Sequence, residues 1–121
     1  MQYLTIGDAL HLVQRLGFYV KDAGLLDSAL SRPSTEVFGL EAYPSLAMKA
    51  AAMQQSLVKN HALIDGNKRT SWLLLNAFIE INAYELVMTA DEGFDLTLGV
   101  AEGRYELAEA AAIIERHLKA L

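Results

Sequence analysis

One short segment, residues 61–70, contains most of the side chains in this sequence that could do chemistry together. It reads HALIDGNKRT and includes His61, Asp65, Lys68 and Arg69. Histidine exchanges a proton near neutral pH and often acts as a general base. One carboxylate combined with phosphate oxygens is a common way to bind Mg²⁺. The segment therefore holds a base, a metal ligand and cations for phosphate, which are the parts that phosphoryl transfer needs.

The segment also lies between two predicted helices, and this placement favours an anion site. Gly66 allows a backbone turn that other residues resist, and Asn67 is a favoured N-cap. A helix that begins here presents unpaired N–H groups and the positive end of its dipole. Lys68 and Arg69 stand where the dipole disfavours cations, so an anion beside them would be stabilising. We expect a phosphate site here; the alternative is an ordinary turn and cap beside a solvated Lys-Arg pair.

Apolar residues repeat with helical spacing along nearly the whole chain, which predicts one all-α domain, a compact helical bundle over residues 1–121. Capping-box spacing opens the first and fifth helices at Thr5 and Thr89. The helix 68–82 is apolar on almost every side, which places it, with Trp72, in the centre of the bundle. Six helices are expected: Ile6–Leu16, Leu25–Leu30, Pro44–Asn60, 68–82, a fifth helix between Thr89 and Gly103, and Leu107–Leu121. Thr89 opens the fifth helix, Gly103 ends it, and Phe94 is expected to point inward.

Residues 31–43 do not follow the helical pattern. They read SRPSTEVFGLEAY, and Pro33 and Gly39 interrupt them. We expect a strand or hairpin around 35–38.

Composition excludes several classes of protein. The chain has 121 residues, 53% of them hydrophobic, which suits a single folded domain and excludes global disorder. The formal net charge of −5 argues against nonspecific nucleic-acid binding. The absence of cysteine excludes a disulfide scaffold, a zinc–thiolate site and a cysteine nucleophile. We find no apolar stretch long enough for a membrane span and no signal peptide, so we expect a soluble cytoplasmic protein.

The segment 61–69 resembles the motif of the Fic/Doc family, H-x-F-x-[D/E]-G-N-[G/K]-R, and specifically its Doc (death-on-curing) branch. The stretches at 3–5, 24–33 and 43–52 are also similar to Doc-type proteins, so the resemblance covers nearly the whole chain. It implies a small helical bundle that uses ATP and Mg²⁺. The implied roles are a catalytic base for a protein hydroxyl at His61, a Mg²⁺ ligand at Asp65, and nucleotide-phosphate contacts from Gly66, Asn67, Lys68 and Arg69.

The resemblance also implies partners. The irregular segment would be a flap whose strand edge pairs with a target backbone. Its expected target-binding residues are Arg32, Thr35, Glu36, Val37 and Phe38. Doc-type toxins are neutralised by a Phd-type antitoxin and act on translation elongation factor Tu, so the resemblance implies a toxin of a toxin–antitoxin pair that blocks translation.

Two departures from the motif bear on the activity. Leu63 stands where the motif has Phe, and either apolar side chain can anchor the loop. AMP-transferring Fic enzymes usually have Gly at the position of Lys68 and a second Arg at that of Trp72. Lys at this position accompanies transfer of the γ-phosphate of ATP to Ser or Thr, so the implied activity is that of a protein kinase. AMP or other nucleotidyl transfer, and a catalytically inactive binding module of the same fold, are the alternatives.

Overall fold

The computed structural model describes residues 1–121 as six α-helices, one 3₁₀ turn and two two-stranded antiparallel sheets. In chain order the elements are α1 (Ile6–Leu16), α2 (Ala23–Ser31), η1 (Arg32–Ser34), β1 (Glu36–Val37), β2 (Leu40–Glu41), α3 (Leu46–Lys59), α4 (Asn67–Ile81), β3 (Tyr84–Leu86), α5 (Ala90–Ala101), α6 (Leu107–Arg116) and β4 (Leu118–Ala120).

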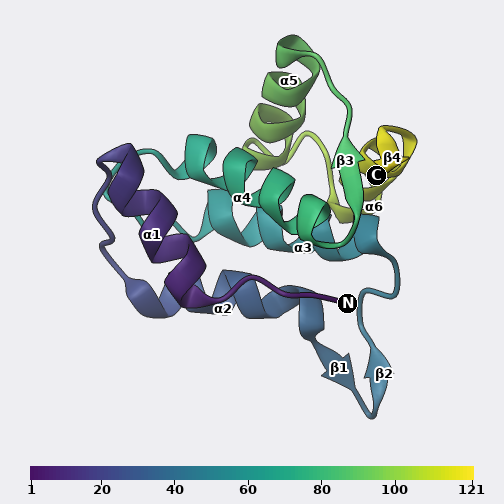
Figure 1. The fold of residues 1–121 in the computed structure, drawn as a ribbon, viewed down its shortest axis with the longest axis horizontal. Coiled ribbons are helices and arrows are strands. Elements are labelled where there is room, and N and C mark those ends of the chain that lie inside the picture. Colours follow the sequence, from purple (N-terminus) through teal and green to yellow (C-terminus); the bar gives the residue numbers. More distant parts are fainter.

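Helices α3 and α4 form the centre of the molecule. They lie side by side, with α1 and α2 to one side and α5 and α6 to the other (Figure 1). Four alanines of α3 are buried, and their small side chains let the neighbouring helices approach closely: Ala47, Ala50, Ala51 and Ala52. The central position predicted for the helix that follows the HALIDGNKRT segment is confirmed. None of the helices is both long enough and apolar enough to cross a bilayer.

Capping side chains set most helix bounds. The capping boxes at Thr5 and Thr89 are present, and Gly17 ends α1 in the left-handed conformation with φ 78°. The prediction that Pro44 is the first helical residue is wrong. The Ser45 hydroxyl accepts a hydrogen bond from the Met48 N–H at 3.1 Å, so the helix begins one residue after Ser45. The inward position predicted for Phe94 is also wrong, because this side chain is 68% exposed.

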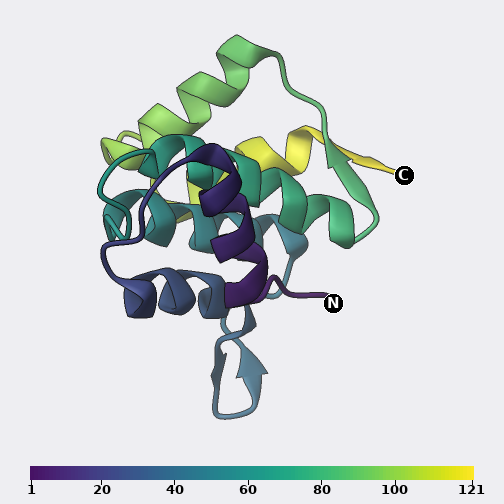
Figure 2. The same cartoon turned by 60° about the vertical axis from the view of Figure 1, so that its left-hand side comes forward.

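The two small sheets make the chain mostly helical rather than strictly all-α. The hairpin expected near 35–38 is confirmed: β1 and β2 pair Glu36 with Glu41 and Val37 with Leu40. This hairpin projects from the helical body in both views (Figures 1 and 2).

The second sheet corrects the last predicted helix. The chain leaves α6 at His117 and then pairs with β3, Leu118 opposite Leu86 and Ala120 opposite Tyr84. The spacing of the apolar residues at 118 and 121 is compatible with a helix or with a strand. Pairing with β3 favours the strand.

His117 joins α6 to the start of α5 through two side-chain hydrogen bonds. These contacts should make the stability of the protein depend on pH. The Nδ1 of His117 lies 2.7 Å from the Ile113 carbonyl and its Nε2 lies 2.9 Å from a Glu92 carboxylate oxygen. These contacts raise the pKa of His117 above its ordinary value of 6.5. Because the folded-state pKa is the higher one, the stabilisation is complete below the unfolded-state pKa and is lost as pH rises through the folded-state value.

We therefore expect His117→Gln to lower the free energy of urea unfolding at acidic pH and to have little effect at alkaline pH, in a series from about pH 5 to pH 9. His11→Gln, which changes an exposed histidine of α1, is the control and should leave the profile unchanged. An identical loss in His117→Gln across the whole series would contradict this account.

Candidate active site

The loop at residues 60–66 joins α3 to α4 and carries the candidate base. His61 lies two residues after the end of α3, is exposed, and has a left-handed backbone with φ 50°. Its ring nitrogens form no hydrogen bond within the chain. The imidazole is therefore free to accept a proton from a bound molecule.

The middle of this loop is fastened to the connection between α1 and α2. The backbone N–H groups of Lys21 and Asp22 both donate to the Ala62 carbonyl, at 2.8 and 3.0 Å, and the Ile64 N–H donates to the Tyr19 carbonyl at 3.1 Å. An isolated antiparallel bridge pairs Val20 with Leu63. Ala62 and Leu63 are buried, so the loop is anchored in the core as expected for an apolar residue at position 63.

The prediction that Asn67 caps α4 is wrong. The N-cap is Gly66, in the left-handed conformation, and Asn67 is the first helical residue. The Asn67 side chain instead closes the loop: its Oδ1 accepts from the Leu63 N–H at 3.1 Å and its Nδ2 donates to the Leu63 carbonyl at 3.0 Å. Its amide holds the loop shape, while its backbone N–H and the second hydrogen of Nδ2 remain available to an anion.

The start of α4 has backbone donors that nothing in the chain satisfies. The Thr70 N–H donates to the Gly66 carbonyl at 2.9 Å, but the N–H groups of Asn67, Lys68 and Arg69 have no acceptor within the chain. The helices α1, α2, α3 and α5 each have an N-cap side chain that accepts a hydrogen bond from their first turn. Three free N–H groups and the helix dipole make the start of α4 suited to an anion.

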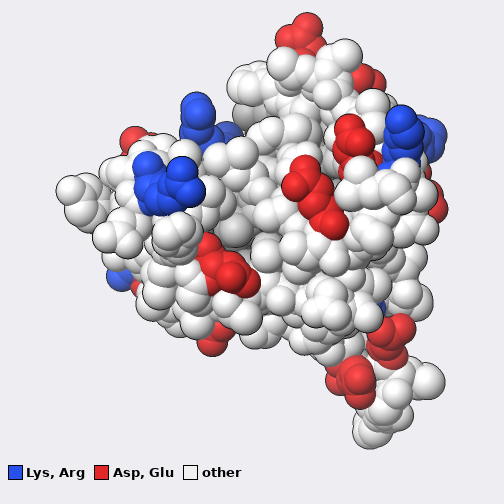
Figure 3. Space-filling model, viewed as in Figure 1, with Lys and Arg blue, Asp and Glu red and all other residues white.

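Charged side chains stand around these donors. Lys68 and Arg69 are exposed, and in Figure 3 two groups of Lys and Arg side chains lie over α1 and the start of α4. Asp65 is also exposed, and one of its carboxylate oxygens accepts from the Gly66 N–H at 2.8 Å. The second carboxylate oxygen of Asp65 makes no hydrogen bond within the chain and is available to a cation. No group of three or more His, Cys, Asp or Glu side chains could hold a metal ion, so phosphate and water oxygens would have to complete a Mg²⁺ shell around Asp65.

A pocket of about 430 Å³ adjoins the two cations, between α4 and α5. It is lined by Lys68, Arg69, Trp72, Ala90, Gly93, Phe94, Thr97 and Leu98. Trp72 is half-buried: it packs against the core, as the sequence predicts, and also forms part of this lining. A Cβ at Gly93 would lie 2.6 Å from the Trp72 ring, so α5 can pack this closely only with glycine there. The sequence analysis does not predict this pocket; Gly93, a glycine within a predicted helix, is the signal that could have indicated it.

The hairpin expected to be a flap carries exposed apolar residues at its tip. The exposed fractions are 53% for Val37, 101% for Phe38 and 74% for Leu40, and Thr35 and Glu36 are also exposed. The Thr35 hydroxyl already makes a hydrogen bond within the chain, because it donates to the Arg32 carbonyl at 2.7 Å. Four of the five expected target-binding residues are thus accessible on one projecting arm.

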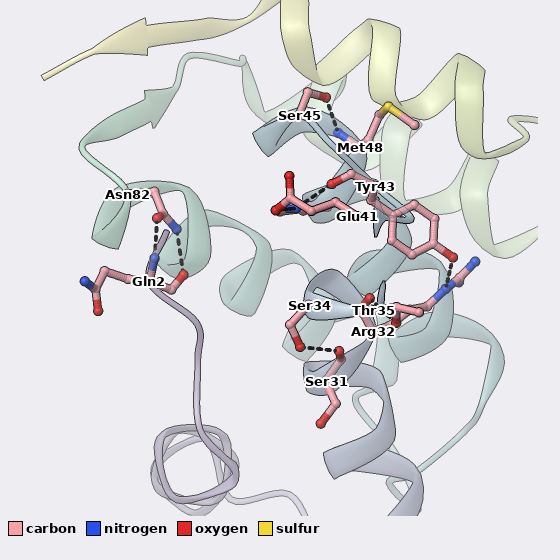
Figure 4. A network of polar contacts seen from close by, with 11 residues as sticks. Gln2, Ser31, Arg32, Ser34, Thr35, Glu41, Tyr43, Ser45, Met48 and Asn82 are labelled. Atoms are coloured by element: carbon pink, nitrogen blue, oxygen red, sulfur yellow. Dashed lines mark hydrogen bonds and ion pairs between the residues drawn. The ribbon is translucent and has the colours of Figure 1, made fainter. Parts of the chain in front are cut away.

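Arg32 differs from those four residues. It lies in η1, before the hairpin, and its guanidinium is engaged inside the chain (Figure 4). It donates to the Tyr43 hydroxyl at 3.0 Å, the Ala52 carbonyl at 3.0 Å, Gln55 Oε1 at 2.8 Å and Ser56 Oγ at 3.1 Å. The structure therefore gives Arg32 a role in joining the segment after the hairpin to α3.

The base of the hairpin is fastened a second time by a buried lysine. Lys49 is 1% exposed, and its ammonium donates to a Glu41 carboxylate oxygen at 3.0 Å and to the Tyr43 carbonyl. Burying a charge is unfavourable unless it is paired and hydrogen-bonded, and both conditions hold here. The two cations together join the base of the hairpin and the segment after it to α3.

In this helical bundle the central helix begins at a loop that bears His61 and is flanked by two exposed cations, Lys68 and Arg69. The chain belongs to the Fic/DOC family, whose profile it matches over residues 2–79. It is also 47% identical over 95 residues to Toxin Doc of Mycolicibacterium smegmatis, an alignment that covers 77% of this chain and 73% of the relative.

Proposed function

We propose that this chain is the toxin of a toxin–antitoxin pair and a protein kinase that transfers the γ-phosphate of ATP to a Ser or Thr hydroxyl. The observation that carries the proposal is the start of α4, where three unsatisfied N–H groups and two exposed cations adjoin the loop that bears His61 and Asp65. The relative named Toxin Doc supports the toxin assignment. By the same resemblance, the proposed target is elongation factor Tu in the cytoplasm and the proposed inhibitor is a Phd-type antitoxin.

In the proposed reaction the N–H groups at the start of α4, with Lys68 and Arg69, bind the phosphates and offset their charge. His61 takes the proton from the target hydroxyl while the hydroxyl oxygen forms a bond to the γ-phosphorus. The bond between the γ-phosphorus and the bridging oxygen breaks, and ADP leaves with that oxygen. Mg²⁺ held by Asp65 and phosphate oxygens would supply further charge neutralisation.

The pocket between α4 and α5 is the proposed place for the nucleoside. Its lining includes the rings of Trp72 and Phe94, which suit a planar base, and it opens beside both cations. The exposed hairpin is the proposed docking arm for the target backbone, because its strands have free edges.

The test uses ATP labelled at either the α- or the γ-phosphate, incubated with the protein, Mg²⁺ and bacterial lysate. We expect γ-label alone to appear on a protein band, and that band identifies the target. Transfer of the α-label would instead show a nucleotidyl transferase, the alternative that Lys68 argues against. Transfer of neither label, from a folded protein that still binds its antitoxin, would favour an inactive binding module.

A further inference from the structure

The side chain of Phe18 lies against the turn on which the proposed site depends. A Cβ at Gly66 would be 2.3 Å from Cε2 and 2.4 Å from Cδ2 of the Phe18 ring, so the ring occupies the space of the missing side chain. We propose that Phe18 is a positioning residue, whose ring holds Gly66 in its left-handed conformation and thereby orients Asp65 and the free N–H groups of α4. This inference rests on the proposed function.

Gly66 lies between Asp65, the proposed metal ligand, and the N–H groups at the start of α4 that are proposed to bind phosphate. Its N–H is held by the Asp65 carboxylate at 2.8 Å and its carbonyl accepts from the Thr70 N–H at 2.9 Å. Its φ of 82° and ψ of 16° set the direction in which the loop enters α4. A rotation at Gly66 would therefore turn the carboxylate away from the helix N-terminus.

Phe18 is itself held in place by the end of α1. Its N–H donates to the Val13 carbonyl at 3.1 Å, and the Gly17 N–H donates to the Gln14 carbonyl, also at 3.1 Å. These bonds stop the helix and direct Phe18 toward the loop. The residues that follow, 19–22, then form the backbone bonds to the loop described above. One short connection therefore supports the site twice, by backbone pairing and by the ring of Phe18.

The ring contact leads to a specific coupling between the two residues. Gly66→Ala places a methyl group where the ring lies, and in the wild-type background it must displace either the ring or the loop. In a Phe18→Ala background that space is empty, and only the left-handed strain of alanine remains.

The experiment combines Phe18→Ala, Phe18→Leu, Gly66→Ala and the double variant Phe18→Ala/Gly66→Ala. The readouts are kcat and KM for γ-phosphate transfer, affinity for inorganic tripolyphosphate, and hydrogen exchange of the amides at 62–70. Leu12→Ala, which truncates a half-buried residue of α1 packed on the core, is the control for general destabilisation. Urea unfolding confirms that every variant used is folded.

We expect Phe18→Ala to lower kcat at least tenfold and to speed exchange at 62–67, with Phe18→Leu intermediate and Leu12→Ala without either effect. Gly66→Ala should lower kcat and tripolyphosphate affinity strongly in the wild-type background, but by no more than about fivefold when Phe18 is already alanine. Additive effects of the two substitutions, or unchanged exchange in Phe18→Ala, would overturn the inference. If wild-type protein transfers no phosphate, the proposed function fails. Hydrogen exchange and tripolyphosphate affinity, compared across the single and double variants, then decide alone whether Phe18 positions the loop.

Discussion

His61→Ala is expected to lower γ-phosphate transfer by about 10²–10⁴-fold, the usual contribution of a general base. The side chain is exposed and makes no hydrogen bond within the chain, so its removal should not change the free energy of unfolding. The affinity for ATP should also be retained, because the proposed phosphate donors belong to the start of α4.

The measurement is single-turnover transfer of the γ-label together with calorimetric ATP binding. His11→Ala, at an exposed position of α1, is the matched control for loss of a surface histidine. A variant at position 61 with unchanged transfer would remove His61 from the mechanism. Equal losses in ATP affinity and in transfer would show instead that the histidine binds nucleotide.

Arg32→Ala is expected to lower the free energy of unfolding by about 2 kcal/mol, because hydrogen bonds to a charged group contribute about 1.5–3 kcal/mol and several are lost together. The four acceptors of its guanidinium lie on α3 and at Tyr43, so the segment after the hairpin should also become more mobile. Arg32→Lys should recover only a small part of the loss, since one ammonium group cannot replace the planar fork of donors.

Urea unfolding and hydrogen exchange at residues 35–43 measure these effects. Phe38→Ala is the contrasting variant: its side chain is fully exposed, so stability should be unchanged while modification of the target falls. If Arg32→Ala were as stable as wild type and failed only with the target, Arg32 would be a contact residue as the sequence suggests.

The helical core could be predicted, and a candidate site located, because the signals are local. The capping boxes at Thr5 and Thr89 and the all-round apolar pattern of α4 mark elements that the structure contains. Residue types alone indicate the segment 61–70 as a candidate site, and the structure places its free N–H groups and both cations at one helix start.

The features that could not be predicted depend on contacts between residues that are distant in the sequence. β4 exists because Leu118 and Ala120 pair with β3, more than thirty residues earlier, and no local pattern distinguishes that strand from another helical turn. Target binding by Arg32 stays a prediction, but the contacts of its guanidinium with Tyr43 and α3 could not be predicted because they join segments that are distant in the sequence. Propensity predicts Asn67 as the cap of α4, whereas its amide is engaged by the backbone of Leu63. Phe18 carries no motif, and only the fold brings it to Gly66.

The hairpin has a further consequence for the free protein. Its strands have unpaired edges, and its tip exposes Val37, Phe38 and Leu40 on an arm that stands clear of the helices. An exposed apolar strand edge can serve as a template for pairing between copies of a chain. The same arm that we propose for target docking is therefore the surface through which the concentrated, unpartnered protein would self-associate, and a partner that covers it would also act as a solubilising chaperone.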